Sequence, residues 1–231
     1  MFLDGGGTVV DRRKLIAAIA CNAAVVVLEI WGIIVTISYN GVGGAFIYYT
    51  NCANVLAAVA CAVCLVGEVR ALRGGRGPGR GAAWLKFAGA CCLLMTFFVV
   101  VFVLVPMLNN AGYDGARLMF TDKARLVTHL IAPLLVVPSY VIFEADRTMT
   151  VRQSLVGFYP TLAYAMLAYV CNIARVWDGP YPFFQVYNME LWETLIWFVV
   201  LFVLAFGLCQ IPRFLSRFVR IRSLSDTSPR S

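Results

Sequence analysis

Charged side chains are scarce in this sequence. Only 13% of its 231 residues are Asp, Glu, Lys or Arg, whereas 61% are hydrophobic. A soluble domain carries about 25% charged and about 45–50% apolar residues. The composition therefore excludes a water-exposed surface over most of the chain, and it predicts an integral membrane protein.

Several kinds of site lack the residues that they need. The chain has one histidine and no carboxylates clustered at ligand spacing, so we expect no metal, and we expect no cofactor. The glycine-rich segment 74–81 has no Lys-Ser or Lys-Thr after it, which favours a flexible linker over a phosphate-binding loop. The eight cysteines all fall in apolar runs, which argues against a disulfide framework. The C-x-x-C pair Cys61 and Cys64 is interpreted as small apolar filler.

Six apolar runs are each close to the ~20 residues that a helix needs to cross ~30 Å of hydrocarbon. The fourth run is the shortest and contains two prolines, but backbone inside lipid must satisfy its own hydrogen bonds, which still favours a helix. The first run lacks a cleavage site after it and is interpreted as a retained span. We predict an all-α polytopic bundle of six transmembrane helices in one domain, 1–211, with a basic cytoplasmic tail, 212–231. The predicted spans are 15–36, 45–66, 84–105, 126–143, 154–173 and 191–211.

Lys and Arg are distributed unevenly between the two faces of this predicted bundle. Of the 19, only Arg117, Lys123, Arg125 and Arg175 fall on one side. The positive-inside rule makes the other side cytoplasmic, together with both termini. Topology and attraction to anionic lipid explain the net charge of +7, so no nucleic acid is needed as a partner. Membrane lipids are the expected partners, and the oligomeric state is left open.

Polar groups inside a span are costly and by default indicate function. The single histidine, His129, lies about one turn into the fourth span from the outer side, and Thr50 lies at a similar depth in the second. Asn54 follows Thr50 by four residues and shares its helix face. Glu29 lies somewhat deeper in the first span. These residues predict a shallow pocket in the outer leaflet.

Asn172 and Arg175 end the fifth span on the outer side, where they could complete this pocket. Lys86 is a different case, because it lies near the inner end of a helix. Its long side chain is expected to reach the aqueous interface and therefore indicates no site.

A hydroxyl beside an imidazole is a combination that can do chemistry. A neutral histidine can take the proton of a threonine hydroxyl and return it to a leaving alcohol. A carboxylate or carbonyl on the other ring nitrogen would fix the tautomer, and Glu29, Glu193 and Asp178 all stay possible. The structural alternatives are a Thr50 hydroxyl bonded to its own i−4 carbonyl and a histidine that only links helices.

Four segments resemble landmarks of one family, in the same order and on the same spans. Segment 46–56 (FIYYTNCANVL) resembles its aromatic-Thr-x-x-(Ser/Thr)-Asn-hydrophobic motif, and 128–133 (THLIAP) its His-x-x-x-Pro motif. Segment 159–164 (YPTLAY) resembles its Pro-x-x-x-Tyr motif, and 179–184 (GPYPFF) its Tyr-Pro-(Tyr/Phe)-Phe loop. The family is that of the bacterial six-span relatives of the androgen-induced membrane hydrolases.

The resemblance implies a function that the pattern of residues does not. Animal members are threonine hydrolases that cleave fatty-acid esters of hydroxy fatty acids inside the membrane. Carried onto this chain, Thr50 would be the nucleophile and His129 the base. Asn54, Asn172 or Arg175 would bind an oxyanion or a carboxylate, and the loop at Tyr181 would cover the mouth. The expected substrate is a lipid ester, and the expected location is a bacterial plasma membrane.

Two alternatives remain open at this point. An acyltransferase would use the same acyl-enzyme but pass the acyl chain to an acceptor other than water. A non-enzymatic protein that binds, transports or scaffolds lipids would use the polar residues only to hold its helices together.

Overall fold

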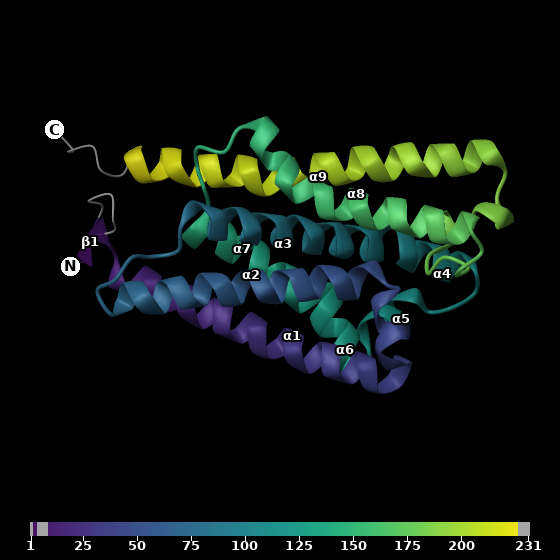
Figure 1. The fold of residues 1–231 in the computed structure, drawn as a ribbon, viewed down its shortest axis with the longest axis horizontal. Helices are drawn as coiled ribbons and strands as arrows, with labels where there is room; N and C mark the ends of the chain where they lie inside the picture. The colour runs from purple at the N-terminus through teal and green to yellow at the C-terminus, as the bar shows by residue number, and fades with distance from the viewer. Residues whose placement is uncertain (1, 4–8, 226–231) are drawn as a thin grey trace.

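Six long helical segments form an elongated bundle in the computed structural model, which describes residues 2–3 and 9–225 (Figure 1). Within these residues, six helical segments are long and apolar enough to cross a membrane. This confirms the predicted all-α, six-span architecture of a multi-pass integral membrane protein. The spans are Arg12–Phe46, Tyr49–Leu72, Arg80–Asn110, Lys123–Glu144, Val151–Ile173 and Leu191–Val219.

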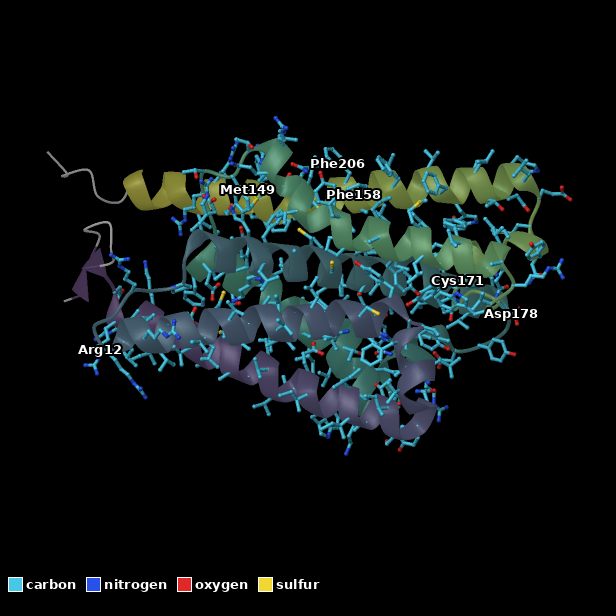
Figure 2. All side chains as sticks on the ribbon, in the orientation of Figure 1. Arg12, Met149, Phe158, Cys171, Asp178 and Phe206 are labelled. Carbon is cyan, nitrogen blue, oxygen red and sulfur yellow. The ribbon has the colours of Figure 1, made fainter. Side chains whose placement is uncertain are left out.

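The spans alternate in direction along the bundle. Figure 2 places Arg12 and Met149 at one end and Cys171 and Asp178 at the other. We call the first the inner end and the second the outer end, following the orientation predicted from the positive-inside rule. Which face is cytoplasmic stays a prediction.

The first two spans are α1 (Arg12–Phe46) and α2 (Tyr49–Leu72). Asp11 caps α1, because its side chain accepts a hydrogen bond from the backbone N–H of Arg13 at 2.9 Å. The helix runs past the predicted end at residue 36 and kinks at Gly41, whose φ of 68° is in the region that glycine favours. Before α1, β1 (Phe2–Leu3) pairs antiparallel with β2 (Val9–Val10).

The third and fourth spans are built from several helical pieces. The third consists of α3 (Arg80–Val99), the π-helical η1 (Val100–Leu104) and α4 (Val105–Asn110). A short helix, α5 (Gly115–Phe120), follows in the outer loop. The fourth span consists of α6 (Lys123–Leu126), η2 (Val127–Ile131), α7 (Ala132–Ser139) and η3 (Tyr140–Glu144), of which η2 and η3 are π-helical.

Proline explains the irregular fourth span. Pro133 has no N–H to donate, and the N–H of Ala132 bonds the carbonyl of Val127, five residues back. The carbonyl of Thr128 is thereby left to accept a hydrogen bond from another helix, which comes from Asn54. The turn that carries His129 is therefore a π-helical turn.

The last two spans are α8 (Val151–Ile173) and α9 (Leu191–Ser225), joined by an outer loop with two 3₁₀ turns, η4 (Pro182–Phe184) and η5 (Val186–Asn188). A capping box of Thr150 and Gln153 starts α8. The helix α9 continues through Pro212, so no break marks the predicted start of the tail at 212. Residues 226–231 of that tail lie outside the described residues.

The central helix is α3, which lies between the α1–α2 pair and the α8–α9 pair (Figure 1). Small residues let its neighbours approach closely. A Cβ at Gly89 would lie 2.9 Å from the Cα of Ala57 on α2, and one at Gly157 on α8 would lie 2.6 Å from the sulfur of Cys91. Such contacts are typical of helix packing in membranes, where burial of apolar surface does not drive association.

Candidate functional site

Thr50 lies in the first turn of α2, with its side chain inside the bundle. Its Oγ1 is 3.4 Å from the hydroxyl of Tyr181, and its backbone N–H points to the same hydroxyl at 3.5 Å. Thr50 therefore makes a contact between distant elements instead of the common bond to its own i−4 carbonyl. At this position in the first turn its N–H has no partner within the helix and is free for such a contact.

A narrow apolar cavity opens beside Thr50. It provides about 40 Å³ of space for water-sized molecules, and its walls come from α2, α3, η1, α8, α9 and the outer loop. A single water needs roughly 10–15 Å³ in this measure, so the cavity accepts a few waters or part of a thin alkyl chain. The lining residues are Tyr49, Thr50, Met95, Thr96, Val99, Val100, Leu104, Thr161, Tyr164, Ala165, Tyr181, Phe183, Phe184 and Leu201.

The outer loop segment 181–184, which we call the aromatic loop, lines this cavity at its outer end. Tyr181, Phe183 and Phe184 are all buried, and the rings of Tyr181 and Phe183 stack with their centroids 5.2 Å apart. The resemblance implied a covering loop at Tyr181, and these residues do form one wall of the cavity. Burial raises the pKa of Tyr181 to about 12, so its phenol is neutral at ordinary pH and can donate a hydrogen bond.

His129 lies on η2, the turn of the fourth span that packs against the start of α2. Its Nδ1 is 3.3 Å from the backbone carbonyl of Met119 in α5. A proton on Nδ1, donated to that carbonyl, leaves Nε2 as an acceptor. The group that orients the ring is thus a backbone carbonyl, and not Glu29, Glu193 or Asp178.

Asn54 connects the turn that carries Thr50 to the turn that carries His129. Its Nδ2 lies 2.7 Å from the carbonyl of Thr50 and 3.4 Å from the carbonyl of Thr128. The two predicted catalytic residues are therefore on adjoining turns. Within the described residues, however, the hydrogen-bond partner of Thr50 Oγ1 is Tyr181, and His129 is not part of the cavity wall.

The remaining predicted residues lie away from the cavity wall. Asn172 holds the outer loop, because its side chain bonds the carbonyl of Trp177 at 3.3 Å and the N–H of Val186 at 2.9 Å. Arg175 places its guanidinium over the ring of Tyr187, 4.3 Å from the centroid. Glu29 is 2% exposed, and its Oε1 has no hydrogen-bond partner among the described residues.

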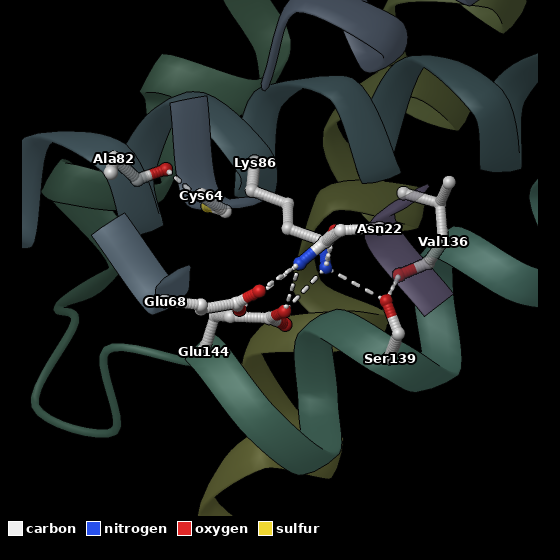
Figure 3. A network of polar contacts seen from close by, with 8 residues as sticks. All are labelled: Asn22, Cys64, Glu68, Ala82, Lys86, Val136, Ser139 and Glu144. Carbon is white, nitrogen blue, oxygen red and sulfur yellow. Dashed lines mark hydrogen bonds and ion pairs between the residues drawn. The ribbon is translucent and has the colours of Figure 1, made fainter. Parts of the chain in front are cut away.

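A second polar site, which was not predicted from the sequence, lies toward the inner end of the bundle. Lys86 is fully buried, so the expectation that it reaches the aqueous interface was wrong. Its Nζ lies 2.6 Å from Oε1 of Glu144, and Figure 3 shows Asn22, Glu68 and Ser139 around this ion pair. We call these five residues the inner cluster. A signal was present in the sequence, because charges of opposite sign occur near the inner ends of three spans.

Asp146 stabilises the loop between the fourth span and α8. Its carboxylate accepts hydrogen bonds from Arg80 Nε at 2.7 Å, from Trp84 Nε1 at 2.9 Å and from both the N–H and the hydroxyl of Thr148. Burial alone would raise the pKa of Asp146, but the hydrogen bonds from Thr148, Trp84 and Arg80 outweigh it and hold the pKa well below its usual range.

Comparison with known proteins identified no relative of this chain. No family model, no curated protein and no solved structure matches the chain. The resemblance to the membrane threonine hydrolases thus rests on the four sequence segments alone.

Proposed function

We propose that this protein is a membrane-embedded lipid-ester hydrolase in which Thr50 is the nucleophile. The observation that carries the proposal is the position of the Thr50 hydroxyl, which lies on the wall of an apolar cavity and within hydrogen-bond distance of the buried Tyr181 hydroxyl. The resemblance of segment 46–56 to the threonine motif of the membrane hydrolases points to the same residue.

The cavity suggests which part of the substrate binds inside the protein. Its walls are almost entirely apolar, so they suit an acyl chain, with the ester group at Thr50. The substrate would enter from the outer leaflet, because Thr50 and the aromatic loop are at the outer end. We propose a fatty-acid ester as the substrate class.

The reaction would proceed through an acyl-enzyme. Thr50 Oγ attacks the ester carbonyl as its proton passes to a base, and the carbonyl oxygen becomes an oxyanion. The Tyr181 hydroxyl and the Thr50 N–H, which now face each other, would both donate to that oxyanion. The leaving alcohol takes up the proton, and water then attacks the acyl-enzyme to release the fatty acid and restore the hydroxyl.

We propose that His129 is the base. Its Nδ1 is held at the carbonyl of Met119, which leaves Nε2 to receive the proton. Asn54 supports this role, since it ties the turn of Thr50 to the turn that precedes His129. A water or a change of side-chain rotamer would complete the path between Thr50 Oγ and Nε2 when substrate is bound.

The decisive experiment compares the purified protein with Thr50→Ala, Thr50→Ser and His129→Ala. Each is incubated with a fluorophosphonate probe and with a branched fatty-acid ester. We expect labelling and hydrolysis in the wild type, partial activity in Thr50→Ser, and loss of both in Thr50→Ala and His129→Ala. Thr36→Ala is the matched control, because that hydroxyl bonds its own i−4 carbonyl on α1 and lies outside the cavity.

The outcomes separate the alternatives. Equal labelling and turnover in wild type, Thr50→Ala and His129→Ala would exclude the hydrolase and favour a protein that only binds or transports lipid. Labelling without release of fatty acid, followed by turnover when an acceptor alcohol or amine is added, would identify an acyltransferase.

A further inference from the structure

The inner cluster joins four of the six spans at one buried point. Asn22 comes from α1, Glu68 from α2, Lys86 from α3, and Ser139 and Glu144 from the fourth span (Figure 3). Asn22 and Lys86 are 0% exposed, Glu68 is 2% exposed and the Glu144 side chain is 3% exposed. Two carboxyl groups and one ammonium group are therefore enclosed together, apart from the cavity at Thr50.

Lys86 has no donor left to offer. Its ammonium group carries three hydrogens, and three acceptors lie around it: Asn22 Oδ1 at 2.7 Å, Ser139 Oγ at 2.8 Å and Glu144 Oε1 at 2.6 Å. The Ser139 hydroxyl in turn donates to the carbonyl of Val136 at 3.3 Å. Lys86 thus satisfies one carboxyl oxygen out of the four in the cluster.

Asn22 cannot satisfy all of the other three. Its Nδ2 has two hydrogens, which are enough for the two oxygens of Glu68 at 3.0 and 2.9 Å, while Oε1 of Glu144, also 2.9 Å away, is the oxygen that Lys86 already satisfies. Oε2 of Glu144 is buried and has no hydrogen-bond partner among the described residues. The Glu68 and Glu144 carboxyl groups lie side by side, because both have an oxygen within 3.0 Å of the same Asn22 nitrogen. One hydrogen-bond donor is therefore missing, at Oε2 of Glu144 beside the Glu68 carboxyl group.

The net charge of the cluster, like its hydrogen bonds, indicates that one proton is missing. Two carboxylates and one ammonium leave a net charge of −1 in a buried site, and such a charge is costly unless it is neutralised. Among the described residues, the other ionisable groups near the cluster are Cys61 and Cys64 on α2 and Tyr140 on η3, none of which is a cation, while Glu29 lies two turns farther along α1, near Cys61. Toward the inner surface, Arg80 is paired with Asp146, and Arg213 and Arg217 on α9 bond the carbonyl of Met149.

We propose that the Glu68–Glu144 pair is a proton-binding site that holds one proton at neutral pH. The proton comes from water at the inner end of the bundle, forms an O–H bond on one carboxyl group, and is donated to the other. No other bond forms or breaks. The cluster then has no net charge, and the missing donor is supplied.

Because this proton is bound, the strength of the contact between the second and fourth spans depends on pH. Loss of the proton leaves two carboxylates facing each other between α2 and η3, and their repulsion acts on the contact between the second and fourth spans. The pair is a proton-sensing contact between the second and fourth spans, and it is independent of the chemistry proposed at Thr50.

The test is the infrared absorption of protonated carboxyl groups in the purified full-length protein, titrated between pH 5 and pH 9. Glu29 is a second buried carboxyl group and would absorb in the same region, so the titration is done in Glu29→Gln. We expect one protonated carboxyl group in Glu29→Gln at pH 7, and none after Glu68→Gln or Glu144→Gln is added. Glu190→Gln is the matched control, because Glu190 is exposed at the outer end.

A thermal unfolding series provides a second readout. A glutamine at position 68 carries permanently the donor that the proton would supply. We therefore expect the melting temperature of Glu29→Gln to fall between pH 7 and pH 9, and that of the double variant Glu29→Gln, Glu68→Gln to change by less than half as much.

Two results would overturn the proposal. The first is the absence of a protonated carboxyl signal at pH 7 in Glu29→Gln. The second is a signal that survives unchanged in both Glu68→Gln and Glu144→Gln.

Discussion

Tyr181 reaches Thr50 from a loop that is 131 residues away in the chain. Because burial raises its pKa to about 12, the phenol keeps its proton and stays a donor across the working pH range. This makes it the best-placed donor for an oxyanion at Thr50. Its neighbour in the same loop, Tyr187, is exposed and bonds the carbonyl of Ile173 instead.

We predict that Tyr181→Phe lowers kcat for ester hydrolysis by about 10²-fold to 10³-fold, the usual loss when one oxyanion donor is removed. KM should change little, since the phenyl ring still lines the cavity. Steady-state kinetics on a branched fatty-acid ester measure both. Tyr187→Phe is the control and should behave like the wild type, and a Tyr181→Phe enzyme with unchanged kcat would remove Tyr181 from the mechanism.

Asp146 gives a prediction about pH. Its pKa is depressed in the folded protein, so its contribution to stability is present above the ordinary aspartate value of about 4 and is lost as the pH falls below that value. We expect Asp146→Asn to melt below the wild type at pH 7, and the gap to narrow below about pH 4. Melting curves of both proteins at several pH values measure it. A gap that is constant with pH would show that the charge of Asp146 is not what stabilises the loop.

At the scale of single elements, glycine decides how closely α2 and α3 approach. We predict that Gly89→Val lowers the free energy of unfolding by about 1–3 kcal/mol, because overpacking has that cost and a side chain at Gly89 would meet the backbone of Ala57. The matched control is Gly207→Val on α9, where a Cβ would meet nothing within 4 Å. Thermal unfolding of the two variants should separate them, and equal melting temperatures would contradict the packing argument.

The fourth span is the element that sequence reasoning described least well. Its length and hydropathy predicted a transmembrane helix, and the helix is there. The π-helical turns were not predicted, although Pro133 and Pro138 are visible in the sequence, because a proline removes a donor without fixing how the freed carbonyls are satisfied. The answer depends on Asn54, which lies on another span.

At the scale of the whole molecule, the distribution of Lys and Arg predicts which end faces the cytoplasm. A cysteine in place of Arg76, in the inner loop, should react with a membrane-impermeant maleimide only after the cells are opened. A cysteine in place of Asp178, in the outer loop, should react in intact cells. The wild type reports the background of its own eight cysteines, and the reverse pattern would invert the topology.

The architecture could be predicted from the amino-acid sequence alone. Too few charges and six apolar runs of bilayer length leave a bundle of six spans as the consistent arrangement, since lipid imposes that constraint on every residue of each span. The sequence also singled out Thr50, Tyr181 and Asn54, which do come together. The contacts between spans could not be predicted in this way: Thr50 contacts Tyr181 instead of His129, Asn172 and Arg175 hold the outer loop, and Lys86 is buried against Glu144. Insertion of a span into the membrane follows from the composition of that span, whereas a hydrogen bond between spans depends on how each helix is rotated and kinked against its neighbours.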